Sequence, residues 1–186
     1  MKSRMRHASL LMILLTASLA IQLGFAQSSI SVQAFQKLEN RLQALESKEA
    51  IRHLLETYID KNESRDYRGY SQLFASNGEL VMRSGSPKGP DNIYQTLEKN
   101  FGGPLAPNSP LRNASHILSN MVIEVDGDTA SARSRWTLLS PAQADGQPKV
   151  SQSGSYTDKL VKENGEWKFL QRIITTSIPV PKPDNQ

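Results

Sequence analysis

The chain has 186 residues, of which 38% are hydrophobic and 22% are charged. This composition suits one ordinary globular domain and excludes a disordered or collagen-like chain. The sequence contains no cysteine, which excludes disulfide scaffolds, thiolate metal sites and cysteine nucleophiles. The formal charge is +4, but three of the 22 basic residues, Lys2, Arg4 and Arg6, precede the first apolar segment. Without them 19 basic residues face 18 acidic ones, a near-balance that argues against a nucleic-acid partner.

The N-terminal segment has the features of a secretory signal peptide. The three basic residues are followed by a largely apolar run at 10–23 and by small residues at Gly24 and Ala26. We therefore expect a signal peptide over residues 1–26, cleavage near Ala26, and a secreted or periplasmic mature protein. An uncleaved anchor is the alternative, although the run is shorter than the roughly 20 apolar residues that span a bilayer. No later segment is long and apolar enough, so we expect no membrane span after cleavage.

Residues 27–46 are predicted to form a helical N-terminal arm. Its apolar residues recur in alternating steps of three and four, as a helix with one buried face requires, at Phe35, Leu38, Leu42 and Leu45. This is about two heptads, too few for a long coiled coil. We interpret the segment as a packing arm or a dimer contact, and a homodimer is the expected oligomer.

The main domain is predicted to begin at residue 47. The helical pattern changes phase near Ser47 and resumes through a second apolar stripe, Ile51, Leu54, Leu55, Tyr58 and Ile59. We expect Ser47 to cap this new helix, which ends in the polar stretch 61–65. The domain extends to residue 178, and residues 179–186, which contain three prolines within a short span, form a flexible tail.

Three shorter elements follow this helix. A short amphipathic segment runs from Asp66 to Ala75, and Asn77-Gly78 supplies a turn into a strand at 79–83. Asp91 is predicted to cap a helix that extends to Phe101. The proline- and glycine-rich residues 101–111 form a loop, because proline lacks a donor and restricts the residue before it.

After this loop, the spacing of the apolar residues changes from the period of a helix to the pattern typical of extended strands. Four strands are predicted at 115–125, 129–139, 150–162 and 166–177, with a loop at 141–148 between the second and third. Asp126-Gly127-Asp128 and Glu163-Asn164-Gly165 are typical hairpin turns. Helices followed by an antiparallel meander predict an α+β domain in which the helices cover one face of a sheet.

After the helix that contains Tyr58, a series of short motifs follows in a fixed order: Glu63-Ser-Arg-Asp66-Tyr67, Leu73-Phe74-Ala75, Gly78-Glu79-Leu80, His116-Ile-Leu-Ser-Asn120, Ile123-Glu-Val-Asp-Gly-Asp128-Thr-Ala, Arg133-Ser-Arg-Trp136, Gly154-Ser-Tyr156-Thr-Asp158 and Gly165-Glu-Trp167-Lys-Phe-Leu-Gln-Arg172. The order and spacing of these motifs along residues 38–179 resemble the SnoaL-like branch of the nuclear transport factor 2-like superfamily. The resemblance implies a cone-shaped, curved antiparallel or mixed sheet that encloses a pocket with about three helices. Since this fold supports many reactions, it predicts a pocket and no particular chemistry.

The resemblance also implies candidate catalytic residues. Members similar to bile-acid dehydratases and scytalone dehydratase place a tyrosine, a carboxylate five residues later, and a histidine at the start of the long strand after the loop. These positions fall on Tyr58, Glu63 and His116. Two departures are that Glu63 replaces the family's aspartate and that the segment 80–83 has no tyrosine.

A histidine, a carboxylate and a tyrosine suffice for eliminating water from a carbonyl-activated substrate, or for isomerising one. His116 would be the base, because its ordinary pKa lies near neutrality. Glu63 would orient it and stabilise the imidazolium, and Tyr58 would donate to an oxyanion or leaving group. The competing interpretations are a structural His116, a solvated Glu63 at a helix end, and a Tyr58 in the core. Asp66 competes with Glu63, but we favour it as a helix cap.

Further residues are candidates for substrate binding. Asn120 is expected on the same strand face as His116, and Met82 and Phe101 are expected in the pocket. Arg135 and Arg172 are candidates for an anionic substrate group. The alternatives are a buried structural Asn120, an exposed Arg135, and a salt bridge from Arg172 to Asp158 across a hairpin. Trp136 and Trp167 are expected to pack the sheet.

No metal or cofactor is predicted, because His53 and His116 have no convincing set of further ligands and no phosphate-binding glycine loop exists. The leading hypothesis is an exported, cofactor-independent lyase (dehydratase) or isomerase that acts on a small hydrophobic hydroxy-carbonyl or polycyclic substrate. The alternative is a non-catalytic ligand-binding or dimeric scaffold protein that uses the same fold.

Overall fold

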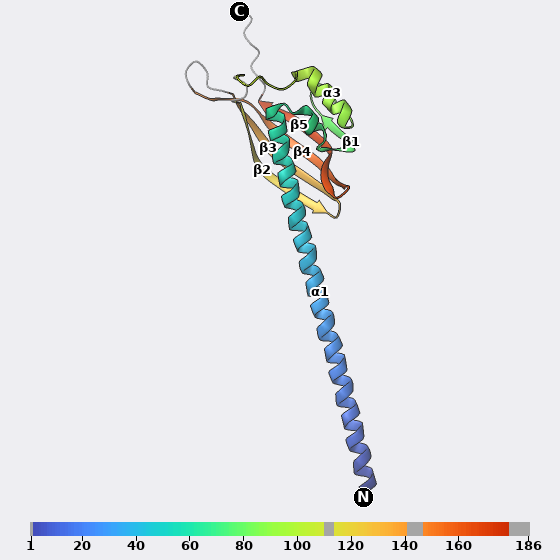
Figure 1. The fold of residues 1–186 in the computed structure, drawn as a ribbon. Helices are drawn as coiled ribbons and strands as arrows, with labels where there is room; N and C mark the ends of the chain where they lie inside the picture. The colour runs from blue at the N-terminus through green and yellow to red at the C-terminus, as the bar shows by residue number, and fades with distance from the viewer. Residues whose placement is uncertain (1, 110–113, 141–146, 179–186) are drawn as a thin grey trace, which may run out of the picture. The chain divides into compact units, whose positions relative to one another are not determined.

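The computed structural model describes residues 2–109, 114–140 and 147–178, with side chains from residue 31 onward. The elements follow in the order α1 (Lys2–Ser64), α2 (Tyr67–Ser71), β1 (Phe74–Val81), α3 (Pro90–Phe101), β2 (Ser115–Asp126), β3 (Thr129–Ser140), β4 (Lys149–Glu163) and β5 (Glu166–Ile178) (Figure 1). The chain divides into two compact units at residues 45 and 46. The predicted tail and most of the predicted loop at 141–148 lie outside the described residues.

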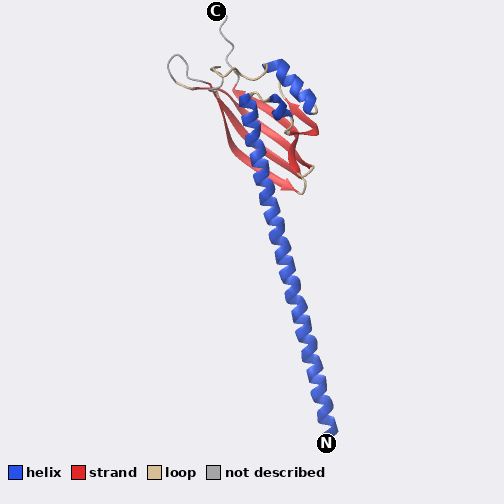
Figure 2. Cartoon of the chain, in the orientation of Figure 1, coloured by secondary structure: helices blue, strands red, loops and turns tan. Residues whose placement is uncertain are grey.

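The strands form one five-stranded sheet in the order β1-β5-β4-β3-β2. β2 to β5 are an antiparallel meander, and β1 adds to the free edge of β5 in parallel (Figure 2). The result is the α+β fold with a curved, mixed sheet and three helices that the sequence predicts. No helix in the described part of the chain is both long and apolar enough to cross a membrane.

The predicted strands of the meander agree with the structure to within one residue at either end. The two tight turns, between β2 and β3 and between β4 and β5, have backbone in the left-handed region, at Gly127 (φ 56°) and at Asn164 and Gly165 (φ 53° and 85°). Glycine and asparagine tolerate this region better than other residues. The local turn chemistry therefore fixes the strand register.

The expected helix start at Ser47 is wrong. α1 continues through this position, and Ser47 is itself buried. The apolar pattern changes phase because the helix changes the face that it buries. Ile51, Leu54 and Leu55 turn toward the sheet, whereas the residues before Ser47 do not.

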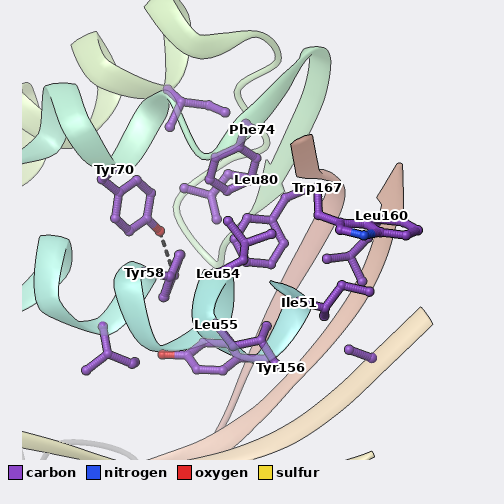
Figure 3. Packing of buried hydrophobic residues seen from close by; sticks show 14 of the residues in the cluster. Ile51, Leu54, Leu55, Tyr58, Tyr70, Phe74, Leu80, Tyr156, Leu160 and Trp167 are labelled. Atoms are coloured by element: carbon purple, nitrogen blue, oxygen red, sulfur yellow. Dashed lines mark hydrogen bonds between the residues drawn. The ribbon is translucent and has the colours of Figure 1, made fainter. Parts of the chain in front are cut away.

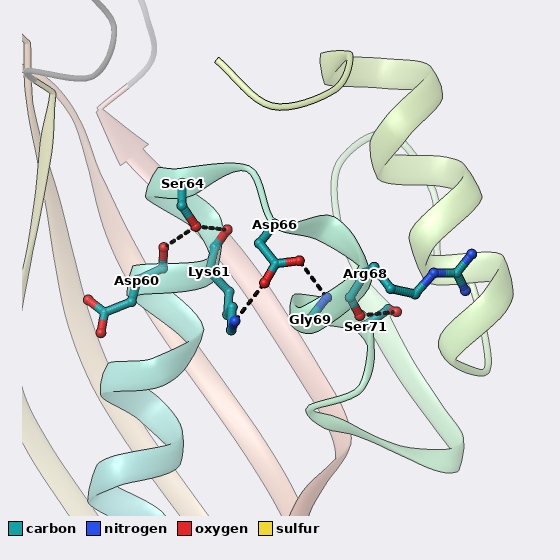
Figure 4. Close-up of polar contacts among 7 residues, drawn as sticks. All are labelled: Asp60, Lys61, Ser64, Asp66, Arg68, Gly69 and Ser71. Carbon is teal, nitrogen blue, oxygen red and sulfur yellow. Dashed lines mark hydrogen bonds and ion pairs between the residues drawn. The ribbon is translucent and has the colours of Figure 1, made fainter. Parts of the chain in front are cut away.

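Asp66 caps α2, as predicted. Its carboxylate accepts a hydrogen bond from the Gly69 amide at 2.9 Å and forms an ion pair with Lys61 at 2.5 Å (Figure 4). These bonds lower the pKa of Asp66, the bond from Lys61 most. α2 ends at Ser71, however, and not at Ala75.

β1 begins earlier than predicted and contains the expected turn. Phe74 pairs with Phe169 of β5, and the register shifts before Glu79, so Asn77 and Gly78 lie in an irregular part of the strand. A β-carbon at Gly78 would lie 2.5 Å from the Phe169 carbonyl oxygen, which explains the glycine.

α3 also starts differently from the prediction. Gly89 is its N-cap and Pro90 occupies the first turn, so Asp91 lies inside the helix and not at its cap. Proline suits this place because the first amides of a helix have no partner within it.

The core lies between the C-terminal part of α1 and the inner face of the sheet. Figure 3 shows Ile51, Leu55 and Tyr58 of α1 facing Leu80 and Leu160 of the strands, each at most 1% exposed. Inner and outer residues alternate along β3 and β4, as a strand with one buried face requires. This alternation decides which strand residues reach the site.

Candidate active site

A cavity of about 450 Å³ lies between the end of α1, the end of α3 and the inner face of β2 to β5. A volume of this size accommodates a small-molecule ligand. The wall is mostly apolar and aromatic, and its polar groups gather where α1 ends and β2 begins. Tyr58, Glu63 and His116 all line it.

Glu63 and His116 are in contact. Oε1 of Glu63 lies 3.4 Å from Nδ1 of His116 and accepts a hydrogen bond from the His116 backbone amide at 2.5 Å. The amide bond fixes the carboxylate beside the ring, although Glu63 and His116 are 53 residues apart in sequence. Nδ1 therefore faces Glu63, and Nε2 is the ring nitrogen left for a ligand.

Burial lowers the pKa of His116, and the nearby Glu63 carboxylate opposes that shift only in part. The imidazole is therefore neutral at neutral pH and able to accept a proton. The Glu63 side chain is 32% exposed but turned toward His116, which rules out the purely solvated helix end.

Tyr58 shares a hydrogen bond with Tyr70. The Tyr70 hydroxyl donates to the Tyr58 hydroxyl at 2.5 Å (Figure 3). Both residues line the cavity. Burial raises the pKa of Tyr58 well above its ordinary value. Tyr58 therefore keeps its proton at neutral pH.

The rim joins the ends of α1 and α3. Nη1 of Arg65 donates to the Phe101 carbonyl oxygen at 2.7 Å, and the rings of Tyr67 and Phe101 lie 6.4 Å apart. Phe101 and Met82 line the cavity, together with Leu105. These three side chains leave the cavity open.

Asn120 does not share the face of His116. The pairing of β2 with β3 shifts between Ser119 and Val122, and Asn120 adopts φ 52° in this bulge. An extra residue reverses the alternation, so Asn120 and Val122 are exposed and Met121 turns inward. The prediction assumed an unbroken strand.

Neither predicted arginine lines the cavity. Arg135 is exposed on the outer face of β3, opposite its buried neighbours Ser134 and Trp136. Arg172 is fully buried and forms the alternative salt bridge, with Nε 3.0 Å from Oδ1 and Nη2 3.2 Å from Oδ2 of Asp158.

Sequence reasoning missed the contribution of Trp136 and Tyr156 to the cavity wall. Trp136 was expected only to pack the sheet, but it also lines the cavity. It pairs with Gly154 of the adjacent strand. A β-carbon at Gly154 would lie 2.8 Å from Cε2 and Cζ2 of the indole. A tryptophan opposite a glycine in adjacent strands was the available signal, because the glycine leaves room for the ring.

The described residues contain no group of three or more His, Cys, Asp or Glu side chains that could hold a metal ion. The arrangement offers a neutral base with a carboxylate beside it and tyrosine hydroxyls, on a mostly apolar and aromatic wall.

The model of the SnoaL-like domain matches residues 43–173. The chain belongs to the SnoaL-like domain family. A search of curated proteins finds no match. The matched region contains every residue of the cavity wall except Ile174.

Solved structures with the same fold include an NTF2-like protein with a cystatin-like fold from Novosphingobium aromaticivorans, with a TM-score of 0.62 and 22% identity over 74% of this chain and 86% of that one. A candidate scytalone dehydratase from the same species has a TM-score of 0.56 and 21% identity, and the match covers 76% of this chain and 95% of that one. LinA has a TM-score of 0.60 and 20% identity over 77% of this chain and 94% of that one. At these identities the likeness establishes the nuclear transport factor 2-like fold.

Proposed function

We propose that this SnoaL-like protein is a cofactor-independent lyase or isomerase that acts on a small hydrophobic hydroxy-carbonyl compound. The observation that carries the proposal is the contact of Glu63 with Nδ1 of His116 on the wall of a mostly apolar and aromatic cavity. The likeness to a candidate scytalone dehydratase supports it.

In the dehydration, Nε2 of His116 takes the proton from the carbon next to the carbonyl group. The electron pair of that C–H bond forms the new C=C bond, and the C–O bond to the hydroxyl on the next carbon breaks. The imidazolium returns its proton to the departing oxygen, which leaves as water. Tyr58 donates a hydrogen bond to the carbonyl oxygen while negative charge develops there.

Glu63 acts as a positioning residue. Its carboxylate orients the imidazole and stabilises the imidazolium that forms during the reaction. In an isomerisation the same groups serve, but the imidazolium returns the proton to a different carbon. The substrate therefore decides between the two reactions.

The wall selects the substrate class. Met82, Leu97, Phe101, Trp136 and Ile174 present apolar surface, which favours a ring system or another apolar body beside the reacting carbonyl group.

The test is a panel of hydrophobic hydroxy-ketones, steroids and aromatic polyketide-like compounds, in deuterated and in ordinary water. Products are followed by mass spectrometry, and binding is followed by thermal shift. Variants are His116→Ala, Glu63→Gln and, as a matched control, His53→Ala, because His53 is exposed on α1.

We expect the wild type and His53→Ala to release water from a compound or to exchange deuterium into it. His116→Ala should lose a factor of roughly 10²–10⁴ in rate while still binding. Equal binding by all four proteins without product or exchange would refute the enzyme and leave the ligand-binding alternative.

We also propose that the protein is exported. The support is the sequence of residues 1–26, with basic residues before an apolar run and small residues at its end. N-terminal sequencing of protein produced from the complete coding sequence should give a start at Gln27 in the exported fraction. An intact Met1 terminus in a cytoplasmic or membrane fraction would contradict export or cleavage.

A further inference from the structure

The arm of α1 exposes five large apolar side chains. Their exposed fractions are 65% for Val32, 62% for Phe35, 62% for Leu38, 55% for Leu42 and 63% for Leu45. Scattered apolar residues on a surface are ordinary, but an unbroken row along one helix marks an interaction surface. Here we call these five residues the arm stripe.

Four members of the arm stripe share one side of the arm helix. At 100° per residue, the directions of Phe35, Leu38, Leu42 and Leu45 cluster within about 80° of one another. The arm stripe is exposed and has no partner among the described residues.

The spacing of the arm stripe is that of a coiled-coil seam. Phe35 and Leu42 take the heptad position a, and Leu38 and Leu45 take the position d. The polar Asn40 takes the position f, directly opposite the seam, and its Oδ1 accepts a hydrogen bond from Nε2 of Gln36 along the helix at 3.2 Å.

The charges beside the seam identify the occupant and its direction. Both e positions after the first turn are acidic, Glu39 and Glu46, and both g positions there are basic, Arg41 and Lys48. All four are exposed. A parallel pair of identical helices brings each g residue to the e residue five positions later in the other helix, so Arg41 meets Glu46 of the second copy. An antiparallel pair brings e to e and g to g, which places like charges together.

We propose that residues 32–46 of α1 form a parallel, in-register, two-stranded coiled coil with a second copy of this chain. Two isolated heptads are marginal, because a short helix must first be nucleated. This helix continues into a segment that the core already holds, so nucleation is not a separate cost. The proposal is independent of the enzyme chemistry.

The test uses the absence of native cysteine. Single variants Phe35→Cys and Leu42→Cys are made in the full chain and oxidised mildly, with Asn40→Cys as the matched control. A disulfide needs α-carbons within about 7 Å. In a parallel, in-register pair both seam cysteines meet their own copies, so both variants should cross-link and the control should not.

Each other pattern overturns the proposal. An antiparallel pair centred on one seam position would hold the two copies of the other position roughly 21 Å apart, so only one variant would cross-link. Equal cross-linking of Asn40→Cys would indicate random collision, and no cross-linking would indicate that another partner covers the arm stripe.

A second measurement follows the mass in solution by light scattering. Leu38→Glu with Leu42→Glu should halve the mass, whereas Ile117→Glu on the sheet should leave it unchanged, although Ile117 is also 48% exposed. Arg41→Glu should weaken the dimer, and adding Glu46→Arg should restore it. A loss of mass only in Ile117→Glu would place the dimer contact on the sheet instead. Because all these side chains are exposed, thermal unfolding should show an intact domain in every variant.

Discussion

Replacing Arg172 with methionine should make the stability of the domain depend on pH above pH 6. Arg172 and Asp158 are 0% and 1% exposed. The guanidinium carbon also lies 3.8 Å from the ring centre of Tyr58 and 4.0 Å from that of Tyr156. Burial raises the pKa of Asp158 to about 6, although the attraction of Arg172 lowers it. Methionine has a side chain of similar length but carries no charge. The substitution therefore removes the attraction of Arg172 that keeps the pKa of Asp158 from rising further.

The sign and size follow from proton linkage. An aspartate that titrates near 3.9 in the unfolded chain and at a higher pH in the folded one contributes stability that is present below about pH 4 and is lost as the pH rises through the folded value. In the wild type this loss is nearly complete at about pH 6. In Arg172→Met the pKa moves higher, so the loss continues at about 1.4 kcal/mol per pH unit. From pH 6 to about 7.5 it amounts to about 2 kcal/mol.

The measurement is urea unfolding of both proteins at about pH 5, 6 and 7.5, with the free energy of unfolding from linear extrapolation. The difference between them removes the contribution of His116, whose lowered pKa acts with the opposite sign in both proteins. The double variant with Asp158→Asn should lose the pH dependence of the difference. A difference that stays constant from pH 5 to 7.5 in Arg172→Met would refute the reasoning.

Three further changes test the packing and the cap. Gly154→Ala should cost about 3 kcal/mol in urea unfolding, since its β-carbon would overlap a carbonyl oxygen of β5 and the indole of β3; Gly103→Ala, which meets nothing within 4 Å, is the control and should change stability by less than about 1 kcal/mol. Tyr70→Phe removes the hydrogen bond to Tyr58 and should cost about 1 kcal/mol in the same assay; an unchanged midpoint would contradict the bond. Asp66→Ala removes the cap of α2 and should cost about 1 kcal/mol in the same assay. An unchanged free energy of unfolding would contradict the stabilising role of this cap.

The meander could be predicted from the sequence because its signals are local. Period-two alternation gives each strand its inner face, and Asp-Gly and Asn-Gly place the hairpin turns. The parallel pairing of β1 with β5 could not be predicted in this way. It pairs Phe74 with Phe169, which are far apart in the sequence. Neither segment contains a local sequence feature that indicates its partner.

The bulge at Asn120 shows why a single residue can defeat a pattern argument. An asparagine tolerates φ 52°, but nothing in the neighbouring residues requires it there. Once the extra residue is inserted, every later side chain of β2 changes face. His116 precedes the bulge and faces inward, whereas Asn120 lies in the bulge and is exposed.

β3, β4 and β5 contribute side chains both to the core and to the cavity wall. The residues that line the cavity and the residues that close the core occupy neighbouring inward-facing rows of the sheet. Across the sheet, Ser134, Tyr156 and Ile174 form one row of paired residues, and Asp158 and Arg172 belong to the next inward-facing row. Tyr156 and Ile174 line the cavity, whereas the following row is closed by the ion pair and by the tyrosine rings packed on it. Because the pairing of β4 with β5 fixes both rows, a slip that exposed Arg172 to the cavity would also withdraw Tyr156 from it. Arg172 therefore acts on the site by holding the ring of Tyr58, and an anionic substrate group would have to be bound by other residues.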